Sequence, residues 1–223
     1  MKQYPLKFIN NHLFIAIDES LWLIDTGSPS SFGETNHITL DNLHFDIAPE
    51  LLGTKASVIS ESTGVPCQGL IGEDILVQFD HLFDLKQDIV TLSKEELPIE
   101  GTMIPLVGFM GIPMIKAEIA GKTFQMVFDT GAQISYLQDE VTSTFPSTGV
   151  VEDFHPIYGD FTSESYDVVG QVENLSFTFR CGILPEVLGL SVSMANAQGV
   201  IGNSIMKGRI LGYFPRRSLL TIV

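Results

Sequence analysis

Cysteine is scarce in this sequence, and that scarcity excludes two kinds of site. Cys67 and Cys181 are the only two in 223 residues, too few for a disulfide framework and too far apart for a zinc-binding pair. The five histidines are scattered and form no HxxxH motif. We therefore expect no metal and no other cofactor.

Basic residues are also few. The chain has 12 Lys and Arg against 27 Asp and Glu, which gives a formal net charge of −15 at pH 7. A surface of this charge repels phosphate backbones, so we expect no nucleic-acid partner.

Long apolar runs are missing as well. No stretch approaches the roughly 18 apolar residues that a membrane helix needs. Residues 1–19 lack the apolar core and the cleavage site of a signal peptide. We expect a cytoplasmic protein that does not associate with a membrane.

What the sequence does contain is an internal repeat, because five segments recur in the same order in its two halves. They are LIDTGSPSSF at 23–32 and VFDTGAQISYL at 127–137, NLHFDI at 42–47 and NLSFTF at 174–179, PELLG at 49–53 and PEVLG at 185–189, GLIGEDIL at 69–76 and GVIGNSIM at 199–206, and FDLKQDIVTL at 83–92 and YFPRRSLLTI at 213–222. One such match arises by chance, but five in order predict two related lobes.

We place the lobes at residues 1–98 and 99–223, with the joint in the Pro- and Gly-containing segment EELPIEGTMIP. The second lobe is longer. Asp25 precedes Asn42 by 17 residues, whereas Asp129 precedes Asn174 by 45, which leaves an insert of 28 residues.

Short segments rich in β-branched and aromatic residues, such as HLFIAI at 12–17 and SLWLI at 20–24, indicate a mainly β protein. Gly, Asn and Asp separate these segments, as is typical of turns. We expect only a few short helices, at 73–79, 138–145 and 203–208.

Each half carries an Asp-Thr-Gly motif after a largely apolar segment, so Asp25 and Asp129 should each end a buried strand. A lone motif of this kind usually forms a turn. If the lobes pack about a pseudo-two-fold axis, however, the two carboxyl groups can meet there and share one proton. One carboxylate can then take a proton from water while the other carboxyl group protonates a carbonyl oxygen, which suits amide hydrolysis.

These motifs resemble those of aspartic proteases of the pepsin and retroviral type. The resemblance rests on DTGS at 25–28, DTGA at 129–132, and the apolar-apolar-Gly segments LIG at 70–72 and VIG at 200–202. It implies a bilobal pepsin/retropepsin-like acid protease fold of two pseudo-two-fold-related β lobes. It also implies an extended peptide or protein substrate, and a monomer, because one chain supplies both aspartates.

The resemblance gives each motif position a role. The aspartates would form the catalytic dyad that holds the attacking water, the threonines would hydrogen-bond to the opposite loop, and the glycines would permit a tight loop. In chain order these residues are Asp25, Thr26 and Gly27 in the first motif and Asp129, Thr130 and Gly131 in the second.

The position after each motif differs, with Ser28 in the first half and Ala132 in the second. Pepsin-like enzymes carry Ser or Thr there and retroviral enzymes carry Ala, so this chain combines the two patterns. We predict that Ser28 donates to Asp25 and favours its charged form, which leaves the shared proton more often on Asp129.

Proteases of this family close a β-hairpin flap over the substrate. The first lobe has only GETNHI after Phe32, which is too short for a flap, whereas the insert of the second lobe contains Tyr158 and Gly159. We predict a single flap there, with strands at 154–158 and 166–172 and a polar turn at 159–165. Tyr158 would be its aromatic anchor and Phe161 would lie over the substrate, unless the segment is an ordinary surface hairpin.

Three functions stay open on the residues alone. The chain is an aspartic-type endopeptidase if the dyad turns over substrate. The same scaffold could be a catalytically silent peptide-binding or regulatory module, because a fold does not imply a function. It could also be a structural two-lobe β protein whose aspartates only cap loops.

Overall fold

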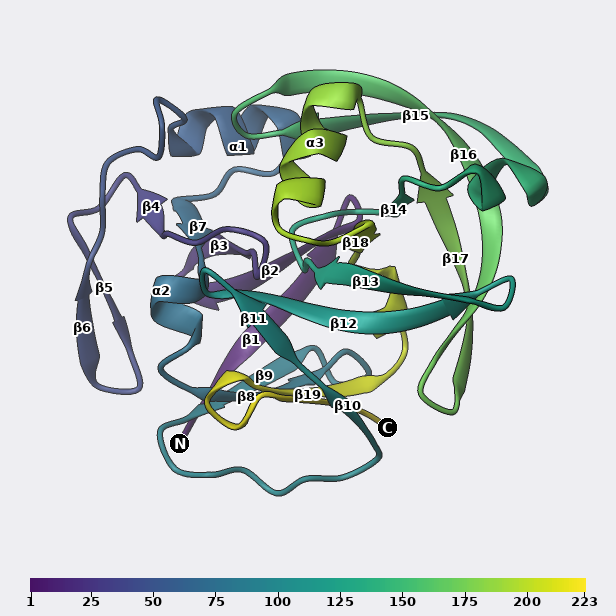
Figure 1. Ribbon diagram of the computed structural model, residues 1–223. Helices are drawn as coiled ribbons and strands as arrows, with labels where there is room; N and C mark the ends of the chain where they lie inside the picture. Colours follow the sequence, from purple (N-terminus) through teal and green to yellow (C-terminus); the bar gives the residue numbers. More distant parts are fainter.

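A computed structural model describes all 223 residues (Figure 1). Two large sheets and a small hairpin account for most of the chain, and only three short α-helices accompany them. The prediction of a mainly β protein with few short helices is confirmed.

The larger sheet joins strands from both ends of the chain. In spatial order its strands are β10 (Thr102–Pro105), β20 (Leu219–Ile222), β19 (Ile210–Phe214), β8 (Asp80–Asp84), β9 (Ile89–Ser93), β1 (Lys2–Ile9), β2 (His12–Ile17), β3 (Ser20–Ile24), β7 (Gly69–Ile71) and β4 (Phe32–Gly33). Within it β8 and β19 pair antiparallel, with Leu82 opposite Gly212. The predicted lobe boundary at residue 98 lies between β9 and β10, and the strands of the two halves meet in this sheet.

The second sheet is built from the second half of the chain. Its strands, in spatial order, are β11 (Val107–Phe109), β12 (Ile112–Ile119), β13 (Lys122–Phe128), β18 (Gly199–Ile201), β14 (Ser135–Leu137), β17 (Leu175–Gly182), β16 (Gly159–Val172) and β15 (Ser147–His155). A separate two-stranded hairpin, β5 (His37–Leu40) and β6 (Leu43–Asp46), stands at the edge of the first half (Figure 1).

The halves repeat one arrangement around the Asp motifs. In the first half β3 runs parallel to β7, with Leu23 opposite Leu70. In the second half β13 runs parallel to β18, with Val127 opposite Val200. The last three residues of β3 and of β13 are apolar and buried, as are β7 and β18, so each Asp motif begins where a strand ends in the core.

The helices are short. They are α1 (Ala56–Thr63), α2 (Glu73–Leu76) and α3 (Glu186–Met194), together with the 3₁₀ turns η1 (Glu140–Thr144), η2 (Asn203–Met206) and η3 (Pro215–Arg217). The three predicted helices correspond to α2, η1 and η2, whereas α1 and α3 were not predicted. No helix has the length and apolar character needed to traverse a lipid bilayer.

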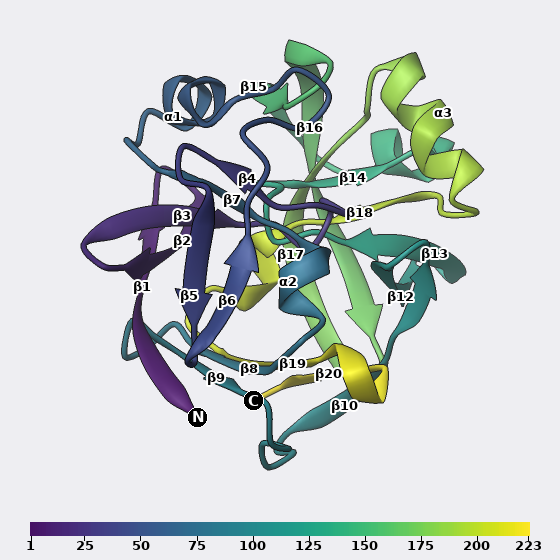
Figure 2. The same cartoon turned by 90° about the vertical axis from the view of Figure 1, so that its left-hand side faces the viewer.

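Two of the three apolar clusters flank the region between α1 and α3. One contains Ile59 of α1 with six other buried residues, and the other contains Leu188 of α3 with seven. Figure 2 shows α1 and α3 on opposite sides of the top of the molecule, with the hairpin of β15 and β16 between them.

Candidate active site

The two Asp loops bind each other through a reciprocal set of hydrogen bonds. Thr26 Oγ1 donates to Phe128 O at 2.7 Å, and Thr130 Oγ1 donates to Ile24 O at 2.8 Å. The backbone N–H of each threonine donates to the other hydroxyl, at 3.1 and 3.0 Å. Because both threonines are fully buried, these four bonds fix the loops against each other.

Each loop is also held by the strand beside it. The backbone N–H of Asp25 donates to Ile71 O at 3.0 Å, and that of Asp129 donates to Ile201 O at 2.9 Å. The apolar-apolar-Gly segments therefore extend the parallel pairing of β3 with β7 and of β13 with β18 up to the aspartates.

The carboxyl groups of Asp25 and Asp129 lie within hydrogen-bonding reach of each other. A Cβ at Gly27 would stand 2.5 Å from Asp129 Cγ, and a Cβ at Gly131 would stand 2.6 Å from Asp25 Cγ. The Cα of each glycine therefore lies against the opposite carboxyl group, with no room for a side chain between them. The structure brings together the Asp, Thr and Gly residues of both motifs.

The environments of the two carboxyl groups differ. Burial raises the pKa of Asp129, and it raises the pKa of Asp25 well above its ordinary range, with the charge of Asp129 as the next cause. Asp25 Oδ1 accepts one backbone N–H, from Gly27 at 2.9 Å. Asp129 Oδ1 accepts two, from Gly131 at 2.8 Å and Ala132 at 3.1 Å. The backbone N–H of Ser28 also acts on Asp25, so donors to the carboxyl groups do not distinguish the two loops. The pKa of Asp25 is raised further because burial and the charge of Asp129 both oppose its ionisation, which favours the shared proton on Asp25.

The Ser28 hydroxyl does not donate to Asp25 as predicted, although the Ser28 backbone N–H favours the charged form of Asp25. The hydroxyl donates to Ser30 O at 2.9 Å, because the loop curls back on itself. Ser28 supports the loop through its backbone instead, since its carbonyl accepts the N–H of Glu73 at 2.9 Å. The prediction that the shared proton lies more often on Asp129 depended on this hydroxyl bond, so it is not supported.

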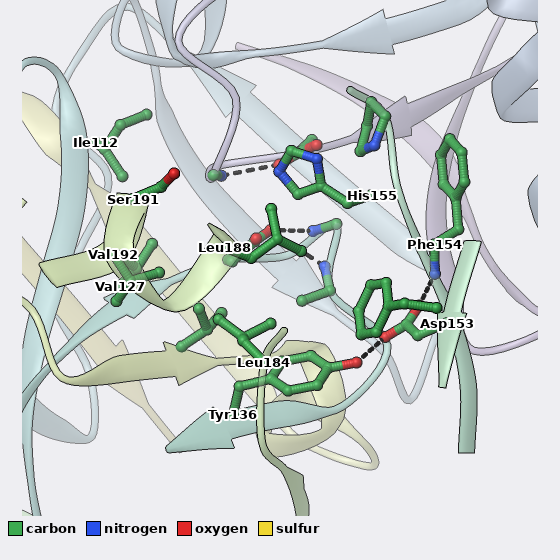
Figure 3. A pocket seen from close by; sticks show the side chains of 18 of the residues that line it. Ile112, Val127, Tyr136, Asp153, Phe154, His155, Leu184, Leu188, Ser191 and Val192 are labelled. Carbon is green, nitrogen blue, oxygen red and sulfur yellow. Dashed lines mark hydrogen bonds between the residues drawn. The ribbon is translucent and has the colours of Figure 1, made fainter. Parts of the chain in front are cut away.

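A cleft of about 250 Å³ opens over the two aspartates. Figure 3 shows apolar side chains such as Ile112, Val127 and Val192 along one side, with Asp153 and Phe154 on the other. The apolar side comes from α3 and its neighbouring strands, and the opposite side comes from β15.

The hairpin of β15 and β16 covers the cleft, but its turn is not where the sequence predicts. His155 pairs with Gly159, so the turn lies at residues 156–158. Gly159 has a φ of +91°, which favours glycine. Residues 159–165 form the start of β16, where exposed polar side chains alternate with the buried Ser163 and Ser165.

The hairpin is attached to both halves of the molecule. Thr54 Oγ1 in the first half donates to Pro156 O at 2.6 Å. Phe154 packs against the apolar cluster below α1. Asp153 accepts a hydrogen bond from the Tyr136 hydroxyl in the second half. The hairpin therefore lies over the cleft with contacts to both halves.

The aromatic residues predicted for the flap lie at its tip. Phe161 lines the cleft, and its ring centroid is 6.0 Å from that of Tyr136 and 6.3 Å from that of Tyr158. Tyr158 is 46% exposed in the turn and packs edge-on against Phe161 without lining the cleft.

Sequence reasoning missed two histidines that line the cleft, His12 and His155. The repeat carries a signal for His12, because His12 begins β2 just as Ile112 begins the equivalent β12, and Ile112 also lines the cleft. No comparable signal marks His155, which lies in the insert that has no counterpart in the first half.

Nothing in the chain is arranged as a metal centre, since no group of three or more His, Cys, Asp or Glu side chains is placed to hold an ion. A comparison with models of known protein families finds no match, and a comparison with curated proteins finds none that matches the chain. Any functional assignment therefore depends on the motifs and on the geometry of the two aspartates.

Proposed function

We propose that this chain is an aspartic-type endopeptidase with the bilobal pepsin/retropepsin-like fold, acting as a monomer on an extended peptide or protein. Residues 1–98 and 99–223 would form its lobes. The observation that carries the proposal is the pair of carboxyl groups, Asp25 and Asp129, held against each other by the reciprocal bonds of Thr26 and Thr130. Two buried carboxyl groups kept this close share one proton, which lets one act as a base and the other as an acid.

In the proposed reaction Asp129 acts as general base and Asp25 as general acid. Asp129 takes a proton from water as the water oxygen bonds to the scissile carbonyl carbon, and Asp25 gives its proton to the carbonyl oxygen. As the C–N bond of the tetrahedral intermediate breaks, Asp129 gives its proton to the leaving amine and Asp25 takes a proton from a hydroxyl group of the intermediate, which restores the starting dyad. No bond forms between enzyme and substrate.

The cleft favours an extended peptide lying between the dyad and the hairpin. Its apolar side, with Ile112, Leu188 and Val192, suits an apolar side chain next to the scissile bond. The hairpin must lift for the peptide to enter and close again to exclude water during the reaction.

The test is digestion of a peptide library at pH 3 to 7, with and without a statine-containing peptide inhibitor. We expect cleavage between apolar residues that the inhibitor suppresses. Cleavage that the inhibitor leaves unchanged would contradict the proposal. Binding of the inhibitor with no cleavage at any pH would favour the silent peptide-binding module instead.

A further inference from the structure

His155 is a titratable group in the cleft that the proposed reaction does not use. It is the last residue of β15, and it lines the same cleft as Asp25 and Asp129. Figure 3 shows its imidazole ring between the apolar side of the cleft and Phe154. A polar ring in this position faces any peptide that lies under the hairpin.

The hairpin turn determines which ring nitrogen of His155 carries the hydrogen. Nδ1 accepts the backbone N–H of Ile157 at 3.2 Å and that of Tyr158 at 3.3 Å. A nitrogen that accepts hydrogen bonds is unprotonated, so the hydrogen of the neutral ring is on Nε2. Nε2 makes no hydrogen bond within the chain and is free to donate into the cleft.

The acidic side chains around His155 already have other partners. The charges of Asp129 and Asp153 both act on the ring, but Asp129 accepts the N–H groups of its own loop and Asp153 accepts from Tyr136. His12, the other histidine of the cleft, also lies near these two carboxylates. Burial lowers the pKa of His155 despite both carboxylates, so the ring is neutral at pH 7.

We propose that His155 is a substrate-binding residue whose Nε2–H donates to a backbone carbonyl oxygen of the bound peptide. The inference rests on the proposed peptidase function. An extended peptide closed under the hairpin loses water from carbonyl groups that face away from the dyad, and each such group needs a new donor. His155 supplies one from a ring that the turn already holds in place, so little side-chain entropy is lost on binding.

Acid should weaken this contact by releasing the ring from the turn, although Nε2 keeps its hydrogen in the protonated form. Protonation of His155 places a hydrogen on Nδ1, which can then no longer accept from Ile157 and Tyr158, and the turn loses both bonds. Because burial lowers the pKa of His155, this loss begins below the ordinary histidine value of 6.5. KM should therefore rise on the acid side, in addition to any effect of the dyad on substrate binding.

The test compares the wild type with His155→Phe, which keeps a ring but removes the donor, using one peptide taken from the library digest. At pH 7 we expect KM to rise about tenfold, the value of one hydrogen bond, with kcat changed less than about threefold. The rise in KM below pH 6.5 should be smaller in the variant than in the wild type, because only the effect of the dyad remains. His155→Gln, which keeps an N–H donor, should recover part of the affinity.

The control is His37→Gln, because His37 is exposed on β5 and lies outside the cleft. This variant should match the wild type at every pH. If His155→Phe retains both the wild-type KM and its acid dependence, the inference is wrong while the peptidase proposal stands. If the wild type neither cleaves peptides nor binds the statine peptide, the proposed function itself is wrong.

Should His155→Phe not fold, His155→Gln decides the question by the pH dependence of its KM, because Gln cannot titrate. An acid rise in KM as large as that of the wild type would refute the inference.

Discussion

Gly27 and Gly131 occupy positions where any side chain would enter the space of the opposite carboxyl group. A methyl group on either would stand 2.5 to 2.6 Å from a carboxyl carbon, so the dyad must shift to admit it. We expect Gly27→Ala and Gly131→Ala each to lower kcat about 100-fold or more, because a displacement of about 1 Å is enough for such a loss. The measurement is kcat on one library-derived peptide, with circular dichroism to verify the fold.

Gly108→Ala is the matched control, since a Cβ at Gly108 meets no other atom within 4 Å. It should leave kcat unchanged. Full activity of Gly27→Ala would show that the carboxyl groups do not need this close approach.

Thr26 is the second residue whose role can be isolated. Thr26→Val keeps the shape of the side chain but leaves Phe128 O without a donor and Thr130 N–H without an acceptor, both buried. Each unsatisfied group costs about 1–3 kcal/mol, so we expect the free energy of unfolding to fall by about 3 kcal/mol. Urea denaturation measures this change.

Thr26→Ser serves as the comparison, because it retains the hydroxyl and loses only a methyl group. It should destabilise the protein by about 1 kcal/mol. A valine variant as stable as the serine variant would mean that the reciprocal bonds contribute little.

Among the elements, the hairpin of β15 and β16 is held at its tip by one side-chain bond from the first half, Thr54 to Pro156. Removing it in Thr54→Val should let the tip open more often. We expect the amide hydrogens of Ile157 and Tyr158 to exchange about tenfold faster, with global stability lowered by no more than about 1.5 kcal/mol. Hydrogen exchange followed by NMR resolves these two amides.

Thr123→Val, an exposed position on β13, is the control and should leave this exchange unchanged. If the exchange of Ile157 and Tyr158 does not change in Thr54→Val, the tip is held by packing alone.

An element could be predicted where its own sequence segment determines its structure, and not where contacts with distant residues do. The Asp loops were predictable because the repeat presents the same motif twice. The hairpin was predictable from the extra length of the second half, but its turn was not, since a strand with one exposed face has the same polar composition as a turn. His155 lies in the cleft because it directly precedes this turn, so its position could not be predicted either.

The helices show that similar sequence segments in the two halves can adopt different structures. PEVLG at 185–189 enters α3, whereas PELLG at 49–53 forms a turn in which Leu52 and Gly53 have positive φ. The residues of α1 and α3 have modest helix propensity, and both helices bury apolar side chains against the rest of the molecule. Such tertiary stabilisation leaves no local signal.

At the scale of the whole molecule, two buried groups beside Tyr213 limit the pH range of stability. Glu73 accepts from the Tyr213 hydroxyl at 2.8 Å, and burial raises its pKa from the ordinary 4.5 to about 8. His81 Nδ1 donates to Tyr213 O at 3.3 Å, and burial lowers its pKa from 6.5 to about 4. The folded state thus favours a neutral Glu73 and a neutral His81.

The signs of the two effects oppose each other. The contribution of Glu73 is complete below pH 4.5 and is lost as pH rises toward 8, whereas that of His81 is complete above pH 6.5 and is lost as pH falls toward 4. Between pH 4.5 and 6.5 the two effects offset each other, so we expect the free energy of unfolding to be greatest and nearly level there. It should fall by about 2 kcal/mol as pH rises from 6.5 to 8, and by less than about 1 kcal/mol as pH falls from 4.5 to 4. Urea denaturation from pH 3.5 to 9 measures the curve.

Glu73→Gln should remove the alkaline fall, and the exposed Glu50→Gln should not. A wild-type curve that keeps rising from pH 6.5 to 8 would contradict the assignment of a neutral, buried Glu73.

The central claim is that Asp25 and Asp129 act as one catalytic unit, and cleavage of a single peptide by their asparagine variants tests it most directly. Asp25→Asn and Asp129→Asn each preserve the shape of the side chain and remove its ability to exchange the shared proton. The account predicts that kcat falls by at least about 10³-fold in each variant, with the fold retained, because neither aspartate can act without the other. Cleavage within about tenfold of the wild-type rate by either variant would contradict it.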